Sequence, residues 1–218
     1  MSRARSFAAI ATLLVAMGVF AATAAAVETL WKWLPGAENT ALSVETAKIT
    51  FQINGGSSIT CEKTTTTAGE LTKESTLATA SLSMGKCTSL GLPVENEGGG
   101  GAGMISFSVE LHNCLIKAGD AGVLIKLAKE VKLEIPALGT KLSLRGSAIG
   151  LVSPNKSLKK AFTLTLAQAA GKQAIEKCEG GVAQKLETST KGGAFIQTGV
   201  EAKSAEIRFP VVEQEIFV

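Results

Sequence analysis

The sequence predicts an all-β fold, an antiparallel β-sandwich or barrel of about ten to twelve short strands. Three observations lead to this prediction. Apolar and polar residues alternate in several separate stretches, turn-forming residues separate those stretches, and helical periodicity is scarce. Because strict alternation buries one face of a strand and leaves the other in water, it indicates antiparallel sheet rather than a parallel α/β fold.

The alternating stretches give the expected strands in chain order. They are Ile49–Ile53, Ile105–Leu111, Val131–Ile135, Leu142–Leu144, Phe162–Leu166 and Ile207–Phe209. Turn signals lie at Asn54–Gly56, Gly119–Gly122, Pro154–Asn155, Glu179–Gly181 and Lys191–Gly193. Leu124–Lys132 also fits helical spacing, but the alternation of Val123, Ile125 and Leu127 favours a strand. The best helical candidate, Ser157–Lys160, is one turn long.

Residues 1–26 have the features of a secretory signal peptide. Arg3 and Arg5 form a basic region, Phe7–Ala22 is an uncharged apolar run, and Ala24–Ala26 supplies small residues for cleavage. An uncleaved anchor is the alternative, but the run is short for a span of about 20 apolar residues. No later stretch predicts a transmembrane segment. We therefore expect cleavage after Ala26 and a mature protein that is secreted or held non-covalently at the extracellular surface.

Residues 27–218 are expected to form a single secreted β-rich domain, because their length is enough for one core. Residues 97–103, Glu-Gly-Gly-Gly-Gly-Ala-Gly, predict a flexible loop, although the same segment would also suit a boundary between two subdomains. Loss of Arg3 and Arg5 from the 22 basic residues leaves 20 against 19 acidic ones. A charge so close to neutral gives no electrostatic footprint for nucleic acid.

The four cysteines are Cys61, Cys87, Cys114 and Cys178, and all follow the leader. An even number in an exported chain favours two disulfides over a zinc site, and the chain has no Cys-x-x-Cys motif. Three pairings are open. We favour Cys61 with Cys87 and Cys114 with Cys178, because the first two lie on what we interpret as adjacent strands.

Catalytic residue types are few. His112 is the only histidine, Asp120 is the only aspartate, and tyrosine is absent. His112 and Cys114 would share one face of a strand, which suits a thiol catalyst or a metal pair, but no further partner is visible. Glutamates on alternating positions are expected to lie on a solvated face, and paired glutamates leave a hydrolase open. They are Glu110, Glu130, Glu134, Glu201 and Glu206. We predict no catalytic site, no cofactor and no metal.

Trp31 and Trp33 are the only tryptophans, and on an extended segment both point the same way. Such a pair would stack on a sugar ring, which makes these two residues the candidate ligand contacts. The alternative is that they cover one end of the core or belong to a mobile N-terminus. The threonine-rich stretch Thr64–Thr67 favours exposed β-surface.

Several short motifs carry a resemblance to a known group. They are Ile59–Glu62, Gly85–Cys87, Cys178–Gly181, Leu186–Ser189 and Gly192–Gly193. In these motifs the chain resembles small exported actinobacterial β-rich proteins of unassigned function with an early cysteine pair. The resemblance implies a β-rich domain behind a signal peptide and implies no site residues.

Together these observations predict a non-catalytic extracellular or cell-envelope binding or structural protein. A carbohydrate or cell-wall polysaccharide is the first expected ligand, because sheet faces suit extended polymers. An extracellular hydrolase that uses paired glutamates is the alternative, and a coat component that self-associates through a sheet edge is a third interpretation.

Overall fold

The computed structural model describes residues 41–53, 56–71, 77–117, 120–154 and 159–209, and within them the protein is built from strands. The predicted leader, Trp31 and Trp33 lie outside these residues. One 3-10 turn, η1 (Pro136–Leu138), joins two strands. The strands are β1 (Ser43–Glu45), β2 (Ile49–Ile53), β3 (Ser58–Cys61), β4 (Lys63–Leu71), β5 (Leu77–Gly85), β6 (Thr88–Ser89), β7 (Leu92–Pro93), β8 (Glu95–Asn96), β9 (Ile105–Lys117), β10 (Asp120–Leu127), β11 (Val131–Ile135), β12 (Thr140–Ser153), β13 (Ala161–Leu166), β14 (Gln168–Ala169), β15 (Lys172–Gln173), β16 (Leu186–Thr190) and β17 (Ile196–Arg208).

The strands pair antiparallel throughout, and eight of them form a ring. The ladder runs β4-β5-β9-β10-β12-β13-β17, and β1 pairs with β17. Isolated bridges from Ala41 to Glu70 and from Thr46 to Thr64 join the β1 segment back to β4. The backbone bond from Leu42 N to Gly69 O, 3.0 Å, strengthens the same contact. The all-β prediction is therefore confirmed, in its barrel form.

Two long strands, β12 and β17, belong to both halves of the molecule. The first part of β12 pairs with β11 and β16, and its last part pairs with β10 and β13. Likewise β17 pairs first with β16 and β2, then with β13 and β1. Gly146 marks the change of partner in β12, with φ of 96° and Lys185 O 2.0 Å from where a Cβ would lie. Only glycine fits there, and strands that change sheets in this way make the corners of a barrel.

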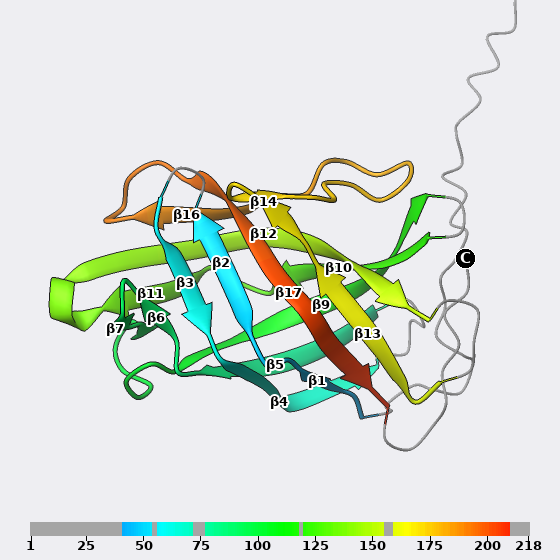
Figure 1. Cartoon of the computed structure of the whole chain (residues 1–218), viewed down its shortest axis with the longest axis horizontal. Coiled ribbons are helices and arrows are strands. Elements are labelled where there is room, and N and C mark those ends of the chain that lie inside the picture. The colour runs from blue at the N-terminus through cyan, green and yellow to red at the C-terminus, as the bar shows by residue number, and fades with distance from the viewer. Residues whose placement is uncertain (1–40, 54–55, 72–76, 118–119, 155–158, 210–218) are drawn as a thin grey trace, which may run out of the picture.

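Figure 1 shows the resulting layers, with β2, β3, β13 and β17 crossing in front of β9, β10 and β12. The core lies between these layers and contains the alternating residues that the sequence indicated. Phe162, Leu164, Leu166 and Ile207 are each at most 4% exposed. Phe162 and Phe209 pack edge to face with ring centroids 6.2 Å apart. The alternation therefore predicted the inward face of these strands correctly.

The structure differs from the prediction in the number and length of strands. It has more strands than the expected ten to twelve because pairs of only two residues, such as β6 with β7, were not visible as alternation. Leu124–Lys132 falls partly in β10 and partly in β11, which confirms strand over helix. Thr64 is 2% exposed and faces inward, so the threonine-rich stretch is not wholly exposed surface. Within the described residues no helix is long and apolar enough to cross a bilayer.

Candidate binding face

Both predicted disulfides form, in the pairing that the sequence favoured. Cys61 bonds to Cys87 and Cys114 bonds to Cys178. Cys61 and Cys87 are fully buried where β3 meets β6. Cys114 lies on the outward face of β9, two residues beyond His112, and ties down the segment that precedes β16. One bridge therefore lies in the barrel core, and the other lies outside the barrel wall, where Cys114 is still only 3% exposed.

A hydroxyl-rich surface covers the outward side of the β4-β5-β9 sheet, and we call it the hydroxyl face. Thr79, Ser81, Ser83, Ser106 and Ser108 come from register pairs that point away from the core. Thr67 joins them at the bulge of β4, where its hydroxyl donates to Ser81 O at 3.1 Å. Ser81 Oγ and Ser108 Oγ lie 3.1 Å apart, and Ser106 Oγ donates to Ser83 Oγ at 3.4 Å. Cross-strand hydroxyl pairs of this kind hold neighbouring side chains in a fixed array.

A groove of about 740 Å³ runs along this face. Its walls come from the chain around Ala41–Ser43, from β4 and from β5, and Ser108 of β9 lies at its side. Thr67 and Ala68 stand at a bulge in β4, where the register with β5 shifts. Bulges bend a strand and re-aim its side chains. The bulge therefore shapes a shallow depression, lined by both hydroxyl-bearing and small apolar residues, in an otherwise regular sheet.

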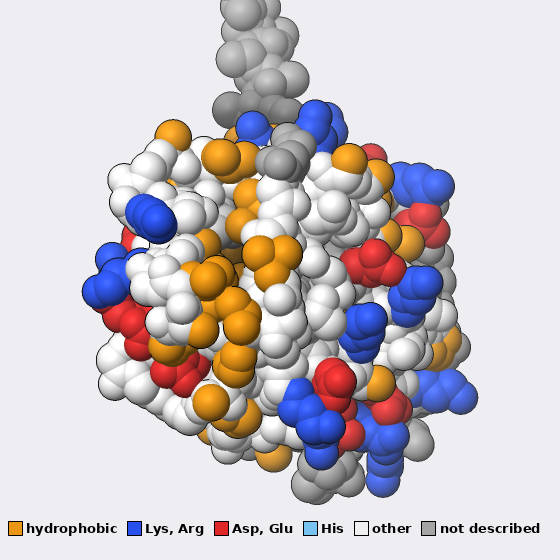
Figure 2. All heavy atoms as spheres, turned by 60° about the vertical axis from the view of Figure 1, so that its left-hand side comes forward, with side chains coloured by type: hydrophobic (Ala, Val, Ile, Leu, Met, Phe, Trp, Pro, Cys, Tyr) orange, Lys and Arg blue, Asp and Glu red, His pale blue; other side chains and the backbone are white. Residues whose placement is uncertain are grey.

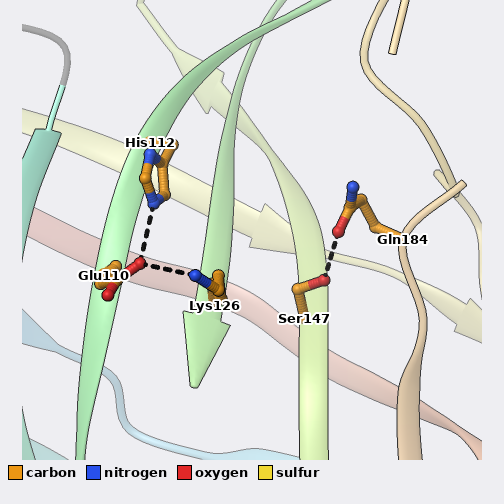
Figure 3. Close-up of polar contacts among 5 residues, drawn as sticks. All are labelled: Glu110, His112, Lys126, Ser147 and Gln184. Atoms are coloured by element: carbon orange, nitrogen blue, oxygen red, sulfur yellow. Dashed lines mark hydrogen bonds and ion pairs between the residues drawn. The ribbon is translucent and has the colours of Figure 1, made fainter. Parts of the chain in front are cut away.

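A charged cluster continues the hydroxyl face onto β10, as Figure 3 shows. Glu110 Oε2 accepts a hydrogen bond from Lys126 Nζ at 3.0 Å and lies 3.1 Å from His112 Nε2. The hydrogen bond from Lys126, followed by that from His112, holds the pKa of Glu110 below its ordinary value. Glu110 is thus an ionised acceptor whose position is fixed by two neighbours.

The far end of this face is bounded by the segment that Cys178 tethers. Ser147 Oγ donates to Gln184 Oε1 at 2.7 Å, and Ser147 N donates to Lys185 O at 3.0 Å (Figure 3). By register Ile149 points outward from β12, yet it is 1% exposed. The tethered segment accounts for this burial, since it lies on the same outward side. The open part of the face is therefore limited to β4, β5, β9 and the near side of β10.

The five candidate glutamates lie on the outer surface, as the alternation predicted. Four of them pair with a lysine or arginine, such as Glu206 with Arg208 at 2.6 Å, and Glu134 accepts from Gly98 N at 3.4 Å. The pKa values of Glu110 and Glu130 are lowered by hydrogen bonds, from Lys126 and Ser143 respectively as the largest cause. No group of three metal-binding side chains occurs within the part of the chain that the structure describes.

The charges on the surface are mixed in sign. Figure 2 shows acidic and basic side chains beside one another on the side that it displays, with apolar side chains gathered in a band between them. The chain as a whole carries 22 basic and 19 acidic residues. A surface of this kind lacks the single-sign field with which proteins attract nucleic acid.

Sequence reasoning did not find the hydroxyl face. A signal was present, because Thr79, Ser81 and Ser83 alternate with Ala78, Ala80 and other apolar residues, and Ser106 and Ser108 alternate with apolar residues in β9. The sequence does not show that these two strands are neighbours in register. Trp31 and Trp33, the predicted ligand contacts, lie outside the described residues, so their role stays a prediction.

Comparison with known proteins gives no relative. No family model matches the chain, and neither a curated protein nor a solved structure matches it. The resemblance to small exported actinobacterial proteins stays a prediction.

Proposed function

We propose that this protein is an exported, non-catalytic binding protein that holds an extended polar polymer, most simply a polysaccharide of the cell envelope, against the hydroxyl face. Export is supported by the signal-peptide features of residues 1–26 and by the two disulfides, which persist in oxidising compartments.

The single observation that carries the proposal is the continuous polar array across β4, β5, β9 and β10. Hydroxyl groups on two neighbouring strands lie in register, and the Glu110 carboxylate continues the array. A sugar polymer presents hydroxyl groups at regular intervals, each of which both donates and accepts hydrogen bonds. Serine and threonine hydroxyls have the same two capacities, so the face matches such a ligand over several units.

The state of the carboxylate on this face favours binding over hydrolysis. A glycosidase needs one carboxylic acid with a raised pKa so that it can protonate the leaving oxygen. Glu110, the carboxylate held in the array, has a lowered pKa because Lys126 and His112 stabilise its charged form. It is therefore suited to accept hydrogen bonds from a ligand rather than to donate a proton.

The test is binding of the secreted protein to soluble and insoluble cell-wall polysaccharides, measured by co-sedimentation and calorimetry. The double variant Ser81→Ala with Ser108→Ala removes one hydroxyl pair that lies 3.1 Å apart. We expect it to weaken binding by about five- to 150-fold, because two hydrogen bonds of about 0.5–1.5 kcal/mol each are lost. Ser58→Ala, at an exposed serine of β3, is the matched control and should bind as the parent does.

Two results would refute the proposal. One is equal affinity in the Ser81/Ser108 variant and the Ser58 control. The other is release of reducing ends from a bound polysaccharide, abolished by Glu110→Gln, which would make the protein a hydrolase.

A further inference from the structure

A cavity lies inside the barrel, separate from the hydroxyl face. Its volume is about 70 Å³, and apolar side chains of both layers form its wall. Phe51 and Val200 line it from the front layer, and Phe107, Ile125 and Ala148 line it from the layer behind. The volume equals that of about two water molecules, or roughly half that of an engineered cavity that admits benzene. It would hold part of a straight aliphatic chain.

Several inward side chains around the cavity are less buried than the rest of the core. Leu82, Phe107, Ile125 and Leu127 point inward by register but are only partly buried, whereas core residues such as Val109 and Val123 are at most 1% exposed. A second cavity of about 10 Å³ shares the side chains of Phe51, Phe107 and Leu144 with the first. A few aromatic and aliphatic side chains therefore separate two spaces along the inside of the barrel.

Two threonines border one end of the cavity, although only apolar atoms form its exposed inner surface. Thr46 and Thr64 are the two polar residues on its wall, and they face each other across a backbone bridge. The Thr46 hydroxyl donates to Lys48 O at 3.1 Å. The Thr64 side chain is 2% exposed, and its hydroxyl has no hydrogen-bond partner among the described residues. A buried hydroxyl without a partner costs free energy, so this group is suited to bond a ligand atom.

The wall of the barrel has a break beside these threonines. β17 pairs with β2 as far as Glu201 opposite Thr50, and with β1 from Glu206 opposite Glu45. Between those ladders residues 202–205 of β17 pair on the β13 side alone, within the described chain. A surface groove of about 350 Å³ lies at this break, and Ala202 borders both the groove and the cavity. Its charged lining is Lys48, Lys203 and Glu201, with Lys203 Nζ 3.9 Å from Glu201 Oε1, so one positive charge remains in excess.

From these observations we propose that the barrel interior binds a short aliphatic chain with an oxygen-bearing, acidic head. The chain enters between residues 46–48 and 202–205. Its tail occupies the apolar cavity, its oxygen accepts a hydrogen bond from Thr64, and Lys48 and Lys203 attract its charge at the entrance. This site is distinct from the hydroxyl face, because the two lie on opposite sides of the same strands.

Hexanoate is the probe, titrated into the full chain with both disulfides formed. Methyl resonances of Leu82, Ile125 and Val200, followed by carbon-proton NMR, should shift and saturate. Ala148→Leu fills the cavity and should weaken binding at least tenfold, whereas Ala169→Leu, at an exposed residue of β14, should leave it unchanged. Thr64→Val keeps the shape of the side chain and removes the hydroxyl, and we expect a loss of about three- to tenfold.

The lysines are tested separately by comparing hexanoate with hexanol. The double variant Lys48→Gln with Lys203→Gln should weaken the binding of hexanoate several-fold and leave the binding of hexanol unchanged. Lys191→Gln, on an exposed turn, should change the affinity for neither ligand. If Ala148→Leu does not fold, the hexanoate affinity of Thr64→Val decides whether the cavity is the binding site. The proposal is overturned if the cavity methyls show no saturable shift, or if Ala148→Leu or Thr64→Val binds as the parent does. If the lysine variant binds hexanoate with the affinity of the parent, the assignment of the entrance to Lys48 and Lys203 is refuted.

Discussion

The two faces of the β5-β9 pair carry opposite kinds of side chain. On the outside, Ser81 is opposite Ser108 and Ser83 is opposite Ser106. On the inside, Leu82 is opposite Phe107 and Met84 is opposite Ile105. Because side chains alternate along a strand, one stretch of chain supplies a polar array to the surface and apolar walls to the interior.

The same strands therefore supply residues to both proposed sites, while each site lies on a different face of those strands. A shift of one residue in register would exchange the faces, so the core fixes where the hydroxyl groups stand. Changes on the inner face should therefore alter folding stability, and changes on the outer face should alter binding. The predictions below test that separation.

Removal of the Cys114–Cys178 disulfide should have one of the largest effects on stability. Cys114 and Cys178 are 64 residues apart, and closing a loop of that length contributes about 4 kcal/mol in the chain-entropy model. The Cys114→Ala, Cys178→Ala variant should lose roughly that amount of unfolding free energy, and chemical denaturation measures it. The corresponding Cys61/Cys87 variant closes a loop of 26 residues but also leaves space in the core. An unchanged midpoint in the Cys114/Cys178 variant would show that the bridge is dispensable.

Adjacent substitutions on the two faces of β9 should then differ. Ile105→Ala truncates a side chain that is 2% exposed and should cost about 2–5 kcal/mol. Ser106→Ala, one residue further on the hydroxyl face, should change stability by no more than about 0.5 kcal/mol. Both are measured by the same denaturant titration. Similar losses in the two variants would mean that the outer face is packed rather than open.

The sequence predicted the inner face far better than the outer one, and the reason is physical. Alternation in Val131–Ile135 or Phe162–Leu166 has high contrast, because large apolar residues stand between polar ones. In β5 the inward residues include Ala78 and Ala80, whose small side chains give a weaker hydrophobic contrast with the outward serines. The hydroxyl face and the cavity also depend on which distant strands pair, and no local pattern records that pairing.

The cysteines are a partial exception. Their number and compartment predicted two disulfides, and the expected proximity of Cys61 and Cys87 predicted the pairing that the structure contains. His112 and Cys114 share a face of β9 as expected, but Cys114 bonds to Cys178 and His112 bonds to Glu110. In the structure the pair is therefore a disulfide cysteine beside a polar histidine, and the partners of Glu110 became visible only with the neighbouring strand that carries Lys126.

The smallest predicted effect concerns the charge on the outer face. The lowered pKa of Glu110 means that its ionised form is stabilised by folding. That contribution is complete above the pKa of the unfolded chain and is lost as the pH falls through the lower pKa of the folded state. Carboxyl-carbon NMR should show the titration midpoint of Glu110 rising in Lys126→Met, because the largest cause of the shift is removed. Lys191→Met should leave the midpoint unchanged, and an unchanged midpoint in Lys126→Met would show that His112 alone holds the charge.

Because Lys126 points away from the cavity, the same variant should bind hexanoate as the parent does, which would separate the two faces by ligand as well as by stability.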